Sequence, residues 1–201
     1  CHSVVSMFLS YGYGYIPPDP NCAVGPAHVI NATNGVIQWR PKNNPQDTRE
    51  FEQPLALFFG LVGSPTEFVF TSDPKVIYDQ YAGRFVLVLM GGFVDPMPWL
   101  VAVSKTSNPN DGWWRHTIPR NVVIGGVTYY GDYPGLAVDD EAVYLTANMF
   151  SGTPTYYGPY LWIIPKTPAY NGPDGALFQL SYDLRALGMG TTTTQPAHMF
   201  G

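Results

Sequence analysis

The chain has 201 residues, of which 45% are hydrophobic, 15% aromatic and only 12% charged, a balance that excludes a disordered chain. The formal net charge of -5 and the lack of a basic run exclude a nucleic-acid-binding protein, and no apolar run reaches the ~18 residues of a membrane-spanning helix. The 21 glycines and 20 prolines show no collagen period, which indicates many turns between short strands. The sequence predicts an all-β domain.

The first third of the chain predicts an arm, a hairpin and one ambiguous segment. Residues 1–18 are rich in Tyr and Gly and end in two prolines, which predicts an N-terminal arm or edge strand. Asn34-Gly35 lies between two apolar runs and predicts a hairpin, because these residues adopt the positive φ angles that a two-residue turn needs. The apolar stretch 55–61 predicts a buried strand or a short helix.

The rest of the chain predicts further strands, and no segment has a helical period with caps. Short apolar runs rich in Val, Ile, Phe, Trp and Tyr alternate with turn residues. The predicted strands are 76–78, 84–89, 98–104, 113–118, 136–138, 142–147, 160–164 and an outer strand at 176–182.

An internal repeat organises these strands. Asp19-Pro20, Asp73-Pro74 and Asp132-Tyr-Pro134 each begin a unit of an apolar stretch, a polar tight turn and an apolar strand, and Gln195-Pro196 begins a fourth. The first and third units align without a gap, Ala23 to Asn34 with Ala137 to Asn148. Repeats near 50 residues built of short strands are typical of β-propeller blades. We therefore expect an N-terminal arm at 1–18 and a β-propeller segment at 19–201, with units starting near 19, 73, 132 and 195.

Three phrases resemble secreted sialidase-like β-propellers with BNR or Asp-box repeats: Ser72-Asp-Pro-Lys-Val-Ile-Tyr-Asp79, Ala102-Val-Ser104 followed by Asn108-Pro and Gly112-Trp-Trp114, and Asp132 to Phe150. The resemblance implies a propeller and an extracellular location, and it implies no activity. Ser107 to Trp114 is only a loose relative of the Asp box, and the Phe-Arg-Ile-Pro phrase of true sialidases is missing.

About three and a half units are present, whereas closed propellers have about four to eight blades. An open propeller leaves strand edges unpaired. We therefore expect four-stranded blades that form part of a six- or seven-bladed propeller, or edges that pair with another subunit.

Asp19, Asp73 and Asp132 begin equivalent strands, so they are expected at equivalent places around the propeller axis. A ring of carboxylates there would bind Ca²⁺ or sugar hydroxyls. Alternatively, each Asp caps its own turn by accepting hydrogen bonds from nearby backbone N–H groups. A structural Ca²⁺ is the one cofactor that the sequence admits, and the histidines lack an identifiable partner for a metal site.

Loop aromatics are the other predicted ligand-binding residues. Trp99, Tyr156, Tyr157 and Tyr160 lie in or beside turn-rich segments, where they would stack on sugar rings or on a partner protein. The alternative is packing between blades.

Two modifications fit a secreted protein. Asn31-Ala-Thr33 is an N-glycosylation sequon, and Cys1 and Cys22 would form a disulfide that ties the arm to the first unit. The alternative for the two cysteines is a pair of unpaired thiols, one of them buried.

The predicted function is a secreted, non-catalytic β-propeller module for binding, adhesion or structural assembly. Its expected partners are a glycan or an extracellular protein, with self-association through strand edges, and without nucleic acid or a membrane span. The alternative is a glycoside hydrolase or lyase of sialidase-like fold, which would need two carboxylates about 5–10 Å apart. No motif identifies such a pair, so the sequence leans against an enzyme.

Overall fold

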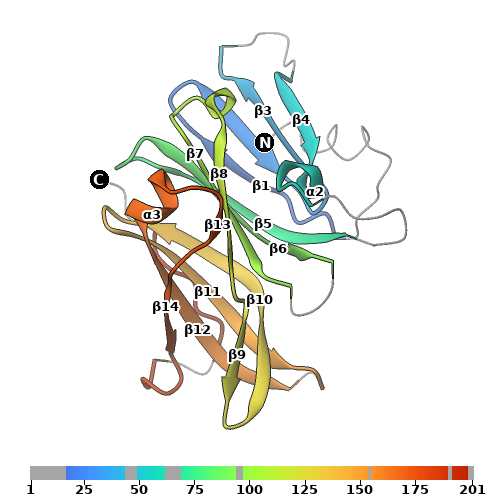
Figure 1. The fold of residues 1–201 in the computed structure, drawn as a ribbon, viewed down its shortest axis with the longest axis vertical. Helices are drawn as coiled ribbons and strands as arrows, with labels where there is room; N and C mark the ends of the chain where they lie inside the picture. Colours follow the sequence, from blue (N-terminus) through green and yellow to red (C-terminus); the bar gives the residue numbers. More distant parts are fainter. Residues whose placement is uncertain are drawn as a thin grey trace.

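The computed structural model describes residues 17–43, 49–61, 69–93, 97–153, 155–189 and 192–198, and they form an all-β fold of three sheets. Figure 1 shows the sheets one after another, from blue at the top to yellow and orange at the bottom. The prediction of an all-β chain is confirmed. Most of the predicted arm, residues 1–16, lies outside the described residues.

Sheet 1 is a four-stranded antiparallel meander in which each strand pairs with the next along the chain. A one-turn helix, α2 (Leu55–Phe58), follows its last strand. The strands are β1 (Asn21–Val24), β2 (His28–Ala32), β3 (Val36–Pro41) and β4 (Phe51–Pro54).

Sheet 2 repeats the meander with longer strands, and a late segment, β13 (Gly175–Ala176), pairs parallel to its outer edge at β8. A 3₁₀ turn, η1 (Pro109–Asp111), precedes β8. The four meander strands are β5 (Phe70–Asp79), β6 (Arg84–Gly92), β7 (Trp99–Ser104) and β8 (Trp113–Ile118).

Sheet 3 has the strand order β14-β12-β11-β10-β9, again with antiparallel neighbours. A short helix, α3 (Lys166–Asn171), lies between β12 and β13 in the chain. The strands are β9 (Asn121–Ile124), β10 (Val127–Val138), β11 (Ala142–Ser151), β12 (Tyr156–Pro165) and β14 (Leu180–Asp183).

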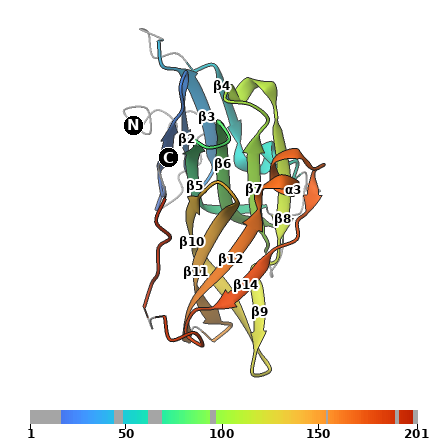
Figure 2. The ribbon, with the colours of Figure 1, turned by 90° about the vertical axis from the view of Figure 1, so that its left-hand side faces the viewer.

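One strand of each sheet meets a strand of a neighbouring sheet. β5 contacts both β1 and β10, so three strands from three sheets lie beside one another. The C-terminal segment 193–198 runs along sheet 3 toward sheet 1, as the dark red trace in Figure 2 shows. His198 at its end lies beside Cys22, Val24 and Tyr78 near the ends of β1 and β5.

Sheet 2 is the centre of the hydrophobic core because it is buried on both faces. Alternate residues of β6 point to opposite sides, with Phe85 and Leu87 facing sheet 1 and Val86 and Val88 facing sheet 3. All four side chains are fully buried. This explains why the predicted strand 84–89 is a continuous apolar run rather than an alternating one.

Most predicted strands are confirmed, and three local predictions are resolved or corrected. The ambiguous stretch 55–61 contains the helix α2. The predicted outer strand 176–182 is wrong as one element, because β13 joins sheet 2 whereas β14 joins sheet 3. The helix α3 was not predicted, since six residues with a proline among them are too few to show a helical period.

The hairpin at Asn34-Gly35 is confirmed, but its predicted positive φ angles are wrong. Thr33 N–H donates to the Val36 carbonyl oxygen across the turn (2.9 Å), and neither Asn34 nor Gly35 has a positive φ. The Asn34 side chain is instead occupied by hydrogen bonds to residues outside the hairpin, described below.

A buried ion pair fastens sheet 3 to sheet 2. Lys166 Nζ of α3 lies 2.7 Å from Asp79 Oδ2 of β5, and Asp79 is fully buried. The Tyr170 hydroxyl donates to the same carboxylate oxygen (2.7 Å), and burial followed by this hydrogen bond raises the pKa of Tyr170. Asp79 Oδ1 also accepts from Tyr81 N–H (3.0 Å). The carboxylate therefore joins the β5–β6 turn to α3.

Asp79→Asn leaves the buried Lys166 ammonium without its counter-charge, and we expect the free energy of unfolding to fall by about 3–5 kcal/mol. Tyr170→Phe removes one hydrogen bond and is expected to cost about 1–2 kcal/mol. Urea unfolding measures both. The control is Asp174→Asn, since Asp174 pairs with Arg115 at 3.9 Å on the surface and its loss should cost under about 1 kcal/mol. Equal losses for Asp79 and Asp174 would contradict the assignment.

Candidate functional site

Two of the three predicted aspartates share an unusual backbone conformation. Asp19 (φ 42°) and Asp73 (φ 54°) have positive φ, and no other non-glycine residue in the described part of the chain does. Both precede a proline, which disfavours helical angles in the residue before it. Such strain persists only where neighbouring contacts hold the backbone in place.

Asn34 holds both aspartates in this position. Its Nδ2 donates to Asp19 Oδ2 (2.7 Å) and to the Pro17 carbonyl oxygen (2.8 Å), and its Oδ1 accepts from Asp73 N–H (2.8 Å). Asn34 belongs to sheet 1 and Asp73 to sheet 2, so one buried side chain joins the two sheets where their inner strands begin.

The third aspartate lies at the equivalent irregularity of sheet 3. The pairing of β5 with β6 shifts register between Ser72 and Lys75, and that of β10 with β11 shifts between Asp132 and Gly135. A proline lies inside each shift, and proline interrupts the ladder because it has no N–H to donate. Both shifts therefore have the same physical cause.

The carboxylates of Asp19 and Asp132 lie close enough to Asp73 to affect its pKa. Burial raises the pKa of Asp73 above its ordinary 3.8, and the charges of Asp132 and Asp19 raise it further, against a hydrogen bond from Ser72 Oγ (2.7 Å) that lowers it. The structure thus brings together the aspartates that the repeat places at equivalent positions. The Asp19 carboxylate accepts a hydrogen bond from the Asn34 side chain, which lies in the turn between β2 and β3. Asp19 therefore does more than cap its own local turn.

A hollow of about 380 Å³ opens beside these residues, and we call it the Asp hollow. The Tyr133 side chain is 40% exposed and offers an aromatic surface, while Lys75 supplies a positive charge. The lining residues are Asp19, Pro20, Asp73, Pro74, Lys75 and Tyr133.

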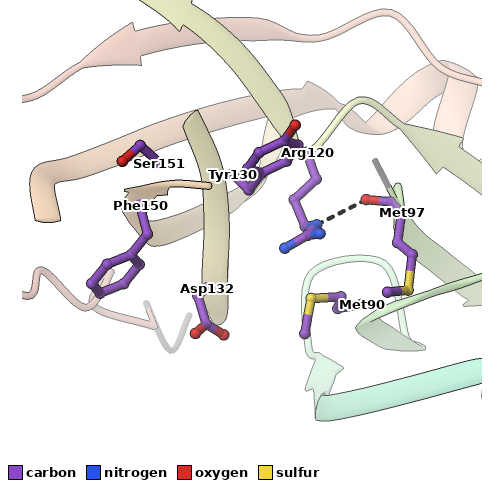
Figure 3. A pocket seen from close by; sticks show the side chains of 7 residues that line it. All are labelled: Met90, Met97, Arg120, Tyr130, Asp132, Phe150 and Ser151. Carbon is purple, nitrogen blue, oxygen red and sulfur yellow. Dashed lines mark hydrogen bonds between the residues drawn. The ribbon is translucent and has the colours of Figure 1, made fainter. Parts of the chain in front are cut away.

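A second hollow of about 290 Å³ has Asp132 in its lining and lies between sheets 2 and 3 (Figure 3). Arg120 is fixed there, since its Nε donates to the Met97 carbonyl oxygen (2.8 Å) and its Nη1 to the Gly131 carbonyl oxygen (2.7 Å). The hollow combines a buried cation with aromatic and thioether walls. Its lining residues are Met90, Met97, Arg120, Tyr130, Asp132, Phe150 and Ser151.

The described residues contain no group of three or more His, Cys, Asp or Glu side chains arranged to hold a metal ion. The acidic turn 139–141 has a local structural role: Asp139 Oδ1 accepts from Glu141 N–H and Ala142 N–H, both at 2.9 Å. The Tyr144 hydroxyl donates to Asp139 Oδ2 (2.6 Å), which raises the pKa of Tyr144 to about 12. The Asp139 carboxylate of this turn therefore binds neighbouring protein groups through hydrogen bonds.

The predicted aromatic residues do not gather into one binding surface. The prediction for Trp99 is wrong, because its side chain is fully buried and packs edge-on against Trp162 at 5.7 Å between ring centroids. Tyr160 also packs against Trp162, at 5.2 Å. Packing between sheets, the alternative considered for these residues, accounts for both.

The two remaining tyrosines lie at the start of β12. Tyr157 is half-buried, packs against Tyr129 at 5.0 Å, and donates its hydroxyl to Asp183 (2.5 Å), which raises the pKa of Tyr157. Tyr156 is 39% exposed, more than the other three predicted stacking residues, and its ring packs against Phe150 at 5.5 Å.

Asn31 of the sequon is fully buried in β2, whereas glycosylation requires an accessible amide, so a glycan there is incompatible with this packing of the strand. Cys1 lies outside the described residues, and the disulfide from Cys22 to Cys1 stays a prediction.

Sequence reasoning missed Asn34, Tyr133 and every lining residue of the second hollow except Asp132. Asn34 has the signal of a turn residue, and its alignment with Asn148 was the only hint of a repeated role. Met90 lies on β6 and Arg120 in the connection between β8 and β9, and no spacing in the sequence relates them.

The described residues include no helix long and apolar enough to cross a membrane. A scan against protein-family models finds no matching family, and a search of curated proteins finds no significant match.

The raised pKa of Asp73 predicts a pH-dependent stability difference. The folded state disfavours the ionised carboxylate, so the stability that Asp73 contributes is greatest below the ordinary pKa of 3.8 and falls as the pH rises through the raised value. Asp73→Asn removes this dependence. Its free energy of unfolding relative to wild type should therefore increase from about pH 3 to about pH 6. Denaturant titrations at several pH values measure it, with the exposed turn variant Asp140→Asn as control. A difference that stays constant with pH would contradict it.

Proposed function

We propose that the three sheets are blades of a β-propeller of six or seven blades, and that the chain is part of a secreted, non-catalytic binding module. Three observations support the blade arrangement: the sheets are meanders, β5 lies beside both β1 and β10, and the middle sheet is buried on both faces. Propeller blades are meanders of about four strands around a central axis.

The observation on which the proposed binding function rests is the Asp hollow. Carboxylate oxygens accept hydrogen bonds from ligand hydroxyls, and charged hydrogen bonds are stronger than neutral ones. Tyr133 adds an exposed ring on which a sugar can stack. Tyr133 lines the Asp hollow and its neighbour Asp132 lines the second hollow, so the two hollows together offer an extended site at the junction of the sheets. A glycan with several hydroxyl groups is the ligand that matches this combination.

One observation favours an enzyme as the second candidate. Asp73 has a raised pKa next to the carboxylates of Asp19 and Asp132, and a glycoside hydrolase uses one protonated and one ionised carboxylic acid. Hydrolysis of a panel of aryl glycosides distinguishes the two candidates. Turnover that Asp73→Asn abolishes would favour the hydrolase, and binding without turnover favours the module.

Glycan-array binding of the wild-type chain tests the proposed site. Asp132→Asn removes a charged acceptor and Tyr133→Ala removes the ring, and each should weaken binding of the best array ligand at least about tenfold, the equivalent of ~1.4 kcal/mol. Tyr182→Ala is the matched control, since it removes a similarly exposed tyrosine from the opposite edge of sheet 3. An equal effect of Tyr182→Ala and Tyr133→Ala would reject the Asp hollow as the site.

Secretion predicts that Cys1 and Cys22 are oxidised. Alkylation of the denatured, unreduced protein should then modify no cysteine, and alkylation after reduction should modify both, as intact mass measures. Modification of both cysteines without a reductant would contradict the disulfide.

A further inference from the structure

Sheets 1 and 3 have the same strand pairing, so their faces can be compared residue by residue. The pairs Asn21–Ala32 and Val24–Val29 of sheet 1 recur as Gly135–Thr146 and Val138–Val143 of sheet 3. Asn34 follows Ala32 at the same spacing as Asn148 follows Thr146. Ala23, Ile30 and Ala32 therefore correspond to Ala137, Tyr144 and Thr146.

The corresponding faces differ in what covers them. In sheet 1, Ala23, Ile30 and Ala32 belong to the core shared with sheet 2 and are buried. In sheet 3, the core shared with sheet 2 contains Val143 and Leu145, which lie on the opposite face from Tyr144 and Thr146. The face of sheet 3 that matches the covered face of sheet 1 therefore points away from sheet 2.

This outer face of sheet 3 is largely apolar and partly exposed. Paired residues share a face, so Tyr144 continues through Ile163 to Leu180, and Thr146 continues through Leu161 to Tyr182. Leu180 is 45% and Tyr182 39% exposed, on a strand at the edge of its sheet among the described residues. Exposed apolar patches of this kind mark interaction sites. We define the outer face as Tyr144, Leu161, Ile163, Leu180 and Tyr182.

The segment 193–198 forms hydrogen bonds with sheet 3 that resemble those between the start of β5 and sheet 1. Thr71 Oγ1 donates to the Asn34 carbonyl oxygen (2.6 Å), and Asp73 N–H donates to Asn34 Oδ1. On sheet 3, Asn148 Nδ2 donates to Thr193 Oγ1 (2.9 Å), and Thr146 Oγ1 donates to the Thr194 carbonyl oxygen (2.7 Å). Gln195-Pro196 then follows as Asp73-Pro74 follows Thr71.

One hydrogen bond of this arrangement is missing. Asn148 is 8% exposed, and its buried Oδ1 has no hydrogen-bond partner among the described residues, whereas Asn34 Oδ1 accepts from Asp73 N–H. An unpaired buried acceptor costs free energy, so its surroundings are incomplete. The donor that would complete them is a backbone N–H at the start of another sheet.

We propose that the outer face of sheet 3 is the docking surface for a fourth antiparallel sheet of the same repeat, reached through segment 193–198. The proposal rests on the blade arrangement proposed above. The fourth sheet covers Tyr144, Leu161 and Leu180, as sheet 2 covers Ile30 and Ala32, and segment 193–198 settles so that Gln195 N–H donates to Asn148 Oδ1. The occupant is a sheet with an apolar face toward sheet 3 that follows residue 198 along the polypeptide.

Dye binding and light scattering of the 201-residue chain test the surface. With the face uncovered, the chain should bind 1-anilinonaphthalene-8-sulfonate and self-associate without a fixed stoichiometry as its concentration rises. Leu180→Lys with Tyr182→Lys should lower the dye fluorescence at least about threefold and remove the self-association. The matched control is Val123→Lys with Val127→Lys, which charges two exposed valines of the β9–β10 hairpin and should change neither.

Equal behaviour of the two double variants, or a wild-type monomer that binds no dye, would overturn the docking surface. A discrete dimer that persists on dilution and is lost in the Leu180 and Tyr182 variant would make a second copy the occupant and overturn the fourth sheet. Loss of glycan binding through Tyr133→Ala leaves these results unchanged, so the two proposals fail separately.

The melting temperatures of two alanine variants provide a second test of the docking surface. Asn34→Ala should lower the melting temperature by about 4–8 °C, because Asn34 bonds two sheets, and Asn148→Ala by less than about 3 °C, because its interface is unfilled. Equal losses would show that Asn148 is already fully engaged and would contradict the proposal.

Discussion

The fold depends on a sheet that has no polar face. Adjacent residues of β6 and β7 point to opposite sides, and both sides are apolar, so sheet 2 is stable in water only between two other sheets. Sheet 1 covers one side and sheet 3 covers the other. The rest of the arrangement follows from this constraint: the order of the sheets and the proximity of β1, β5 and β10.

Elements that depend on local chemistry could be predicted from the sequence. The apolar runs that became β6, β7, β8, β11 and β12 are bounded by turn residues, and strand length and residue type decide them. The segment 176–182 could not be predicted in the same way. Its two halves pair with different sheets, and the choice is made by the position of α3, which is fixed by the ion pair between Lys166 and Asp79.

The candidate site was predictable in part, for a similar reason. Asp19, Asp73 and Asp132 share a repeated context with a nearby proline, and the repeat itself implies that equivalent residues converge. Trp99 has the same residue type and a similar turn-rich context as an exposed stacking residue, yet it lies between sheets 2 and 3. Nothing local to a tryptophan tells which face of a strand will be covered, since that depends on the sheet that packs there.

Asn34 shows how local chemistry and the packing between sheets depend on each other. It was expected to act through its backbone in a tight turn, whereas its amide group binds the Asp19 carboxylate and the backbone of Asp73 on the neighbouring sheet. The positions of two carboxylates of the Asp hollow therefore depend on how sheets 1 and 2 pack, and the strained φ angles of Asp19 and Asp73 are maintained by that packing. A substitution that loosens the two sheets should change the shape of the hollow even when it lies far from the hollow. The carboxylates belong to three sheets, so the geometry offered to a ligand is a property of the packing between sheets rather than of any one loop.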